Sequence, residues 1–240
     1  METILEKIDL ERRFYGRMII AILVVILIGF APSFYFFQIF SYPRPNPVLT
    51  PMVMLHGFVF TAWVAMFYSQ TRLVADGRRD LHKQWGIAGF GLAVALIPIM
   101  YFTAIQAIPR GTHPPFVDAL TWSAVPLLAI PPTALLLFLG WKYRTTPQAH
   151  KRFMLIATLG MVEPGIGRWP VFPPTLAGHI ASGIVSFAMI IPLLMWDQKT
   201  LGRLHWATKI GIGALLFGYY ARYFVWNTVA WHDLAATLAG

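Results

Sequence analysis

Five ionisable side chains fall in apolar stretches where membrane-spanning helices are expected, and their types could support chemistry. They are His56, Glu163, Arg168, His179 and Arg222. A rise of about 1.5 Å per residue places all five roughly 6–14 Å below the outer boundary of the membrane. Charged groups at such a depth are costly and usually mark a site. Their shared depth on four different predicted helices therefore indicates a polar pocket inside a bundle.

The two histidines of this layer could hold a metal cofactor. Ser182 and Gly183 follow His179 at helical spacing and leave little side-chain bulk on that face. A flat ring could approach there, with His56 and His179 as the axial ligands of haem b. The same residues also fit a purely structural role, because polar side chains hold helices together in membranes.

The charged residues of the layer could serve the same cofactor. Arg168 and Arg222 lie nearer the water, where the propionates of a haem would point. Glu163 is deeper, and an unpaired carboxylate there would be unfavourable. We therefore expect Glu163 to contact at least one of the two arginines or the two histidines. In the surrounding segment 160–169, Pro164 removes a backbone donor and the glycines loosen the helix.

A second group of histidines falls at the inner boundary of the membrane. His82, His150 and His205 each lie in a basic turn that opens a predicted helix. At a shared depth they could form a zinc site with an open fourth position, or two of them could hold a second haem. Each could equally hydrogen-bond a neighbouring carbonyl group or a lipid phosphate. His113 and His232 are expected to be solvated and outside both groups.

The composition identifies the medium in which these residues work. Hydrophobic residues make up 57% of the 240 residues and charged residues only 12%, whereas a soluble domain carries about 25% charged residues. The chain is therefore expected to be an integral membrane protein. The absence of cysteine excludes disulfides, thiolate metal sites and iron–sulfur clusters. The formal net charge of +9 is attributed to membrane topology and not to nucleic-acid binding.

Seven apolar segments have the length of about 20 residues that is needed to span a bilayer. They cover residues 18–40, 51–74, 84–108, 117–141, 151–172, 175–196 and 205–227. The short connections predict antiparallel neighbours in an all-α, polytopic helix bundle. We expect one transmembrane domain over residues 18–240, preceded by a cytoplasmic amphipathic segment over residues 1–17 that lies along the membrane surface.

The distribution of lysine and arginine predicts an N-terminus inside and a C-terminus outside. In that orientation fifteen basic residues face the inner side: Lys7, Arg12, Arg13, Arg17, Arg72, Arg78, Arg79, Lys83, Lys142, Arg144, Lys151, Arg152, Lys199, Arg203 and Lys209. Four face the outer side, namely Arg44, Arg110, Arg168 and Arg222. We therefore expect a multi-pass protein of the inner (plasma) membrane that contacts membrane lipids.

The recurrent basic turn with a histidine, as in Leu-His-Lys-Gln-Trp-Gly over residues 81–86, resembles a turn in uncharacterised bacterial multi-helix membrane proteins. Those proteins are distantly similar to transmembrane haem-b cytochromes of the ascorbate-reducible type. In such cytochromes, histidines on four successive helices hold two haems, one near each membrane face. The resemblance implies that His56 and His179 form the outer pair and that His82 forms the inner pair with either His150 or His205. The chain departs from that pattern in having seven predicted spans and not six.

These observations favour a redox protein that binds haem b in the outer pocket and transfers electrons. Two alternatives stay open. A metal-dependent membrane enzyme could act on a lipid-like substrate at the inner histidines, with zinc as its cofactor. A non-catalytic protein could bind lipid or pigment beside partner subunits of a larger membrane complex.

Overall fold

The computed structural model describes residues 4–40 and 48–240, and all regular secondary structure within these ranges is helical. The helices are α1 (Ile4–Phe30), which continues as the π-helix η1 (Ala31–Tyr35), α2 (Pro51–Ala75), α3 (Arg79–Ala107), α4 (Ala119–Leu128), α5 (Ile130–Lys142), α6 (Pro147–Gly160), α7 (Glu163–Ile166), α8 (Leu176–Ala188), α9 (Ile191–Leu201), α10 (Trp206–Val225) and α11 (Val229–Ala239). Arg44, which is predicted to face the outer side, and residues 1–3 of the predicted N-terminal segment lie outside the described residues.

Within residues 4–40 and 48–240, five segments are long and apolar enough to cross a membrane. They are Leu5–Tyr35, Pro51–Ala75, Arg79–Ala107, Ala119–Lys142 and Leu176–Leu201. The expected all-α membrane bundle is therefore confirmed in its main features. The predicted spans at residues 151–172 and 205–227 are not among the five. Helix α6 ends after 14 residues, and the 20 residues of α10 include Lys209 and Arg222.

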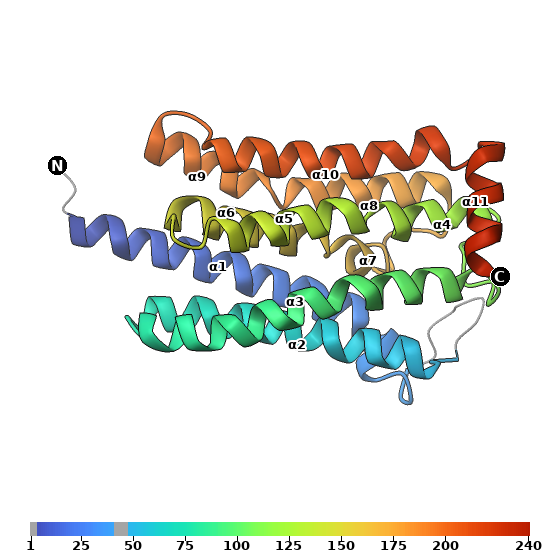
Figure 1. Ribbon diagram of the computed structural model, residues 1–240, viewed down its shortest axis with the longest axis horizontal. Coiled ribbons are helices and arrows are strands. Elements are labelled where there is room, and N and C mark those ends of the chain that lie inside the picture. The colour runs from blue at the N-terminus through green and yellow to red at the C-terminus, as the bar shows by residue number, and fades with distance from the viewer. Residues whose placement is uncertain (1–3, 41–47) are drawn as a thin grey trace.

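Proline divides two of the five segments into paired helices. Helices α4 and α5 meet at Ala129, directly before a proline pair in the first turn of α5. Helices α8 and α9 meet at residues 189–190, before Pro192 in the first turn of α9. Proline has no backbone N–H but fits the first turn of a helix. Each segment therefore restarts as a new helix and continues across the bundle (Figure 1).

The core is centred on α6, which packs against α5 and α10 and is buried on nearly all sides. Phe153 and Ile156 of α6 have no exposed surface. Leu96 of α3 and Leu193 of α9 belong to the same buried cluster and are equally inaccessible. A helix that is covered all round belongs in the middle of a bundle, and the polar residues of α6 must then find partners inside the protein.

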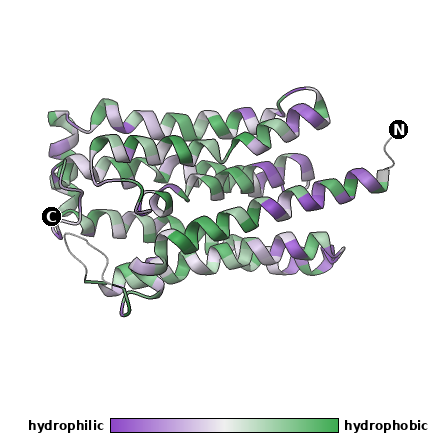
Figure 2. Ribbon diagram, turned by 180° about the vertical axis from the view of Figure 1, so that it is seen from behind, coloured by the Kyte–Doolittle hydropathy of each residue, from purple (hydrophilic) through white to green (hydrophobic). Residues whose placement is uncertain are grey.

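The two ends of the bundle differ in polarity. Figure 2 shows hydrophilic residues gathered at the end where the N-terminus lies. The α2–α3, α5–α6 and α9–α10 turns lie at this end (Figure 1), and they carry Arg78, Arg144 and Arg203. Helix α1 runs without a break through residues 17 and 18. Residues 4–17 therefore form one continuous helix with the first apolar segment, and their predicted position along the membrane surface stays a prediction.

Candidate functional site

The outer half of the site is built on irregular backbone that follows α6. Helix α6 ends at Gly160, and the four-residue helix α7 has Pro164 in its first turn. The expected continuous helix over residues 151–172 is therefore wrong, because Pro164 has no N–H to continue it. A Cβ atom at Gly29 of α1 would lie 2.1 Å from the carbonyl oxygen of Gly165. The backbones of α1 and α7 are thus in direct contact, which fixes the position of Glu163.

Glu163 forms a two-point ion pair with Arg222 of α10. Arg222 Nη2 lies 2.7 Å from Glu163 Oε1, and Nη1 lies 3.2 Å from Oε2. The Arg222 side chain is only 3% exposed, and its guanidinium stacks 3.9 Å from the centroid of Tyr219. Two parallel hydrogen bonds let both charges stay inside the bundle. The expected contact between Glu163 and a neighbouring cation is confirmed.

A cavity of about 520 Å³ opens beside this ion pair. Its walls come from η1, α2, α3, α4, α7 and α8, and from the connections that precede α4 and α8. His56, Glu163, Arg168, His179 and Ser182 all line it. The structure thus brings together five of the seven residues that are predicted to form the outer pocket.

Both cavity histidines are held by aromatic packing. His56 stacks on Phe60 of the next turn, with ring centroids 6.3 Å apart. His179 packs edge-on against Trp122, with centroids 5.1 Å apart. The buried ring nitrogens His56 Nδ1 and His179 Nε2 have no hydrogen-bond partner among the described residues. Buried polar atoms are normally satisfied, so each of these two cavity-lining histidines keeps a buried ring nitrogen whose hydrogen-bonding capacity the described residues do not use.

The two arginines of the outer layer take different positions. Arg168 lines the main cavity, and its guanidinium lies 4.7 Å from the ring centroid of Phe30. Arg222 instead lines a smaller cavity of about 50 Å³, which Glu163 also borders. The expectation that both arginines meet the ligand of one pocket is therefore corrected. Arg222 pairs with Glu163, and of these two arginines only Arg168 lines the main cavity.

The small-residue face of α8 is only partly open. Ser182 lines the main cavity and donates its hydroxyl to the carbonyl oxygen of His179 at 2.8 Å. A Cβ atom at Gly183 would lie 1.8 Å from the hydroxyl oxygen of Tyr219. The expected space for a flat ring beside Gly183 is therefore wrong, because a tyrosine of α10 fills it.

Two basic residues of the cavity wall were not assigned to the site from the sequence. Arg110 and His113 line it from the connection between α3 and α4. His113 is half-buried, and the prediction that it lies outside the site is therefore wrong. The signal in the sequence is the pair Pro114–Pro115, because consecutive prolines restrict a connection to few conformations. His232 is likewise half-buried, with Nε2 3.0 Å from Thr121 Oγ1.

The three inner histidines do not converge. The ring centroids of His82 and His150 lie 6.2 Å apart, and His150 Nδ1 lies 2.8 Å from the carbonyl oxygen of Gly140. His205 instead caps α10, where its Nδ1 accepts a hydrogen bond from the N–H of Ala207 at 3.1 Å. No group of three metal-binding side chains forms within the described part of the chain. The predicted three-histidine zinc site is thus not formed, because helix capping uses His205.

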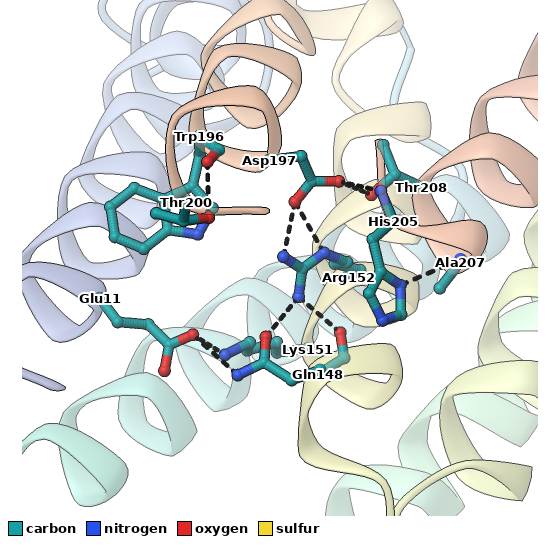
Figure 3. A network of polar contacts seen from close by, with 10 residues as sticks. All are labelled: Glu11, Gln148, Lys151, Arg152, Trp196, Asp197, Thr200, His205, Ala207 and Thr208. Atoms are coloured by element: carbon teal, nitrogen blue, oxygen red, sulfur yellow. Dashed lines mark hydrogen bonds and ion pairs between the residues drawn. The ribbon is translucent and has the colours of Figure 1, made fainter. Parts of the chain in front are cut away.

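The inner half of the bundle contains a buried ion pair that sequence reasoning missed (Figure 3). Arg152 Nε donates to Asp197 Oδ1 at 2.9 Å, and both side chains are at most 1% exposed. Asp197 Oδ2 accepts from the N–H of His205 at 2.9 Å and from Thr208 Oγ1 at 2.6 Å. Nη2 of Arg152 donates to the same oxygen of Asp197. Nη1 of Arg152 donates to the carbonyl oxygen of Gln148 at 2.8 Å. The network therefore ties α6, α9 and α10 together where they meet.

The comparisons with known proteins assign no family to this geometry. No family model, no curated protein and no solved structure matches the chain. The fold and the site define a class only: an all-helical membrane protein with a histidine-lined internal cavity. Its function has to be inferred from the cavity itself.

Proposed function

We propose that the protein binds haem b in the main cavity, between His56 and His179, and transfers electrons through it. The observation that carries this proposal is that two histidines line one cavity of about 520 Å³, and each has a buried ring nitrogen without a hydrogen-bond partner in the described part of the chain. The two histidines come from α2 and α8, so a shared ligand would also join distant parts of the chain. When bound, haem supplies a one-electron carrier, and histidine is one of its common axial ligands.

The other walls of the cavity suit the same ligand. Phe60, Met100 and Trp122 offer apolar surface against which a flat ring can pack. Arg168 provides a guanidinium for a carboxylate of the ligand, where a charge-assisted hydrogen bond is strong. The protein residues would thus orient the ring, exclude water and neutralise one propionate.

The proposal includes a seven-pass topology in the inner (plasma) membrane. The passes beyond the five apolar segments would be α6 with α7, and α10. The ion pair between Glu163 and Arg222 lowers the free-energy cost of placing the charged residues of these two segments inside the membrane. The basic turns gather at the end that carries the N-terminus (Figure 1), which favours a cytoplasmic position for that end.

The geometry also bears on the alternatives. The use of His205 as a helix cap weakens the metal-enzyme alternative. A second haem near the inner face would fall to His82 and His150, whose rings are neighbours, and not to His205. A lipid or pigment could occupy the apolar part of the main cavity. The experiment described next distinguishes this alternative from haem.

The test is the absorbance of protein purified after expression with an ample haem supply. We expect a reduced-minus-oxidised haem spectrum from the wild type and its loss in His56→Ala and in His179→Ala. His232→Ala is the matched control, because His232 packs on Thr121 and does not line the cavity. All variants should reach the membrane in equal amounts.

Three outcomes would overturn the proposal. One is a colourless wild type that is correctly inserted. Another is an unchanged spectrum in both cavity variants. The third is retention of haem in the cavity variants but not in His232→Ala. If the wild type lacks haem, mass spectrometry of solvent extracts would show whether a lipid or a pigment occupies the cavity.

A further inference from the structure

Helix α11 lies across the end of the bundle opposite the N-terminus (Figure 1). Helix α10 ends at Val225, and the chain turns at Thr228, whose hydroxyl donates to the carbonyl oxygen of Val225 at 2.7 Å. The same hydroxyl accepts the N–H of Trp231 and caps α11. The change of direction is therefore fixed by local hydrogen bonds at the junction of the two helices.

The inward face of α11 is anchored on the first turns of α4. Trp231 Nε1 donates to the carbonyl oxygen of Leu120 at 3.1 Å, and His232 Nε2 lies 3.0 Å from Thr121 Oγ1. Ala235 on the same face has no exposed surface. Because α4 begins at Ala119 and opens a segment that is long and apolar enough to span a membrane, we expect the contact to lie near the membrane boundary, where tryptophan is enriched.

The outward side of α11 has an apolar edge and a polar edge. Ala230, Leu234 and Leu238 follow one another at intervals of four residues and therefore share one edge. Leu234 is 49% exposed and Ala230 is exposed. Asp233 and Thr237 are exposed beside this stripe, in line with Val229 of the first turn, which is 76% exposed. A short helix with such edges, lying across the ends of spanning helices, fits the plane of the membrane–water interface.

We propose that α11 is an interfacial helix that docks on the lipid headgroup layer, with Leu234 toward the acyl chains and Asp233 toward water. Two observations favour lipid over a protein partner. The preceding helix α10 also exposes large apolar side chains, Phe217 and Phe224, and side chains of this kind suit contact with lipid. The apolar edge of α11 contains only three residues, whereas a specific protein interface takes about 20–30 residues from each side.

Helix α11 lies close to one wall of the main cavity, but the proposed docking on lipid does not require bound haem. Thr121 and Ser123, which contact α11, flank Trp122 in the sequence. Trp122 lines the cavity and packs against His179. Helix α11 therefore packs on the same turn of α4, but neither α11 nor the residues of α4 to which it hydrogen-bonds line the cavity.

The absence of cysteine in the natural chain makes a direct test available. Single variants Leu234→Cys and Asp233→Cys would carry a nitroxide label in vesicles of phosphatidylethanolamine and phosphatidylglycerol. Phe224→Cys serves as the lipid-facing control and Arg203→Cys, in an exposed turn, as the water-facing control. Collision with oxygen reports lipid exposure, and collision with a water-soluble nickel chelate reports water exposure.

We expect the label at residue 234 to favour oxygen over nickel several-fold more than the label at residue 233. It should lie about 5–10 Å below the phosphate level, the usual depth of such a helix face. Equal access of nickel to both labels would show that α11 stands in water and would overturn the proposal. Shielding of both labels from both reagents would show that protein covers the helix, with the same consequence. A protein preparation without haem leaves this measurement unchanged, so the two proposals can fail separately.

Discussion

Removal of the carboxylate in Asp197→Ala should destabilise the protein more than any substitution of a surface acid. Asp197 neutralises Arg152 and accepts hydrogen bonds from the N–H of His205 and from Thr208. The Arg152 side chain is 1% exposed and has no route to water. In the variant its charge stays buried without a counter-charge, and two further donors lose their acceptor.

The magnitude follows from this geometry. Breaking a buried ion pair by removing one partner costs about 3–5 kcal/mol. For a chain of 150–250 residues, about 1 kcal/mol shifts the melting temperature by roughly 2–4 °C. We therefore expect the melting temperature of Asp197→Ala to fall by about 6–20 °C.

The assay is thermal unfolding in detergent, followed by the fluorescence of the nine tryptophans. The matched control is Asp76→Ala. Asp76 pairs with Arg72 at 3.2 Å, but both side chains are more than half exposed. An exposed pair contributes about 0–1 kcal/mol, so this control should lower the melting temperature by less than about 4 °C.

A double variant distinguishes the effect of the unpaired buried charge of Arg152 from the effect of lost packing. Arg152→Met combined with Asp197→Leu replaces the pair by apolar side chains, and such replacements of buried pairs are often neutral or stabilising. We expect the double variant to melt well above Asp197→Ala. The reasoning would be refuted if Asp197→Ala melted like Asp76→Ala. It would be equally refuted if the double variant melted no higher than the single variant, because the effect would then come from lost packing or from the two donors that lose Asp197 as their acceptor.

Two further substitutions test the outer half of the bundle. Glu163→Gln leaves the buried Arg222 without a counter-charge, so its melting temperature should fall further than that of Arg168→Gln; the reverse order would contradict the assigned pairing. Gly29→Ala would place a Cβ atom 2.1 Å from the carbonyl oxygen of Gly165, and such overpacking typically costs about 1–3 kcal/mol. Gel filtration should show less monodisperse protein for this variant, and an unchanged yield and melting temperature would contradict the close approach.

Depth in the membrane was the coordinate that the sequence could predict. Counting about 1.5 Å per residue along each span placed Glu163 and Arg222 at similar levels, and the structure joins them in an ion pair. The same count placed His56 and His179 together, and both line one cavity. The level of a residue along the bundle is predictable because the chain runs back and forth between loops, and the proline breaks within the segments change its course only locally.

The direction in which each side chain points from its helix was much less predictable. Arg152 was counted among the inner basic residues, but it points into the bundle because Asp197 of α9 neutralises it there. Arg222 shares the depth of Arg168 but faces another cavity, because it pairs with Glu163. A sequence without structure shows which residues share a level. It does not show which side chains on neighbouring helices point toward each other. That depends on how several helices pack at once.

The contact between Gly29 and Gly165 has a consequence for the synthesis of the protein. The two glycines are 136 residues apart in the sequence. At about 5–20 residues per second, the ribosome needs roughly 7–27 s to add the second after the first. During that interval the bare backbone of α1 at Gly29 faces lipid or the insertion machinery. The first helix is therefore in the membrane long before its partner exists, and a stop in translation before residue 165 would leave that surface open to other glycine-bearing helices.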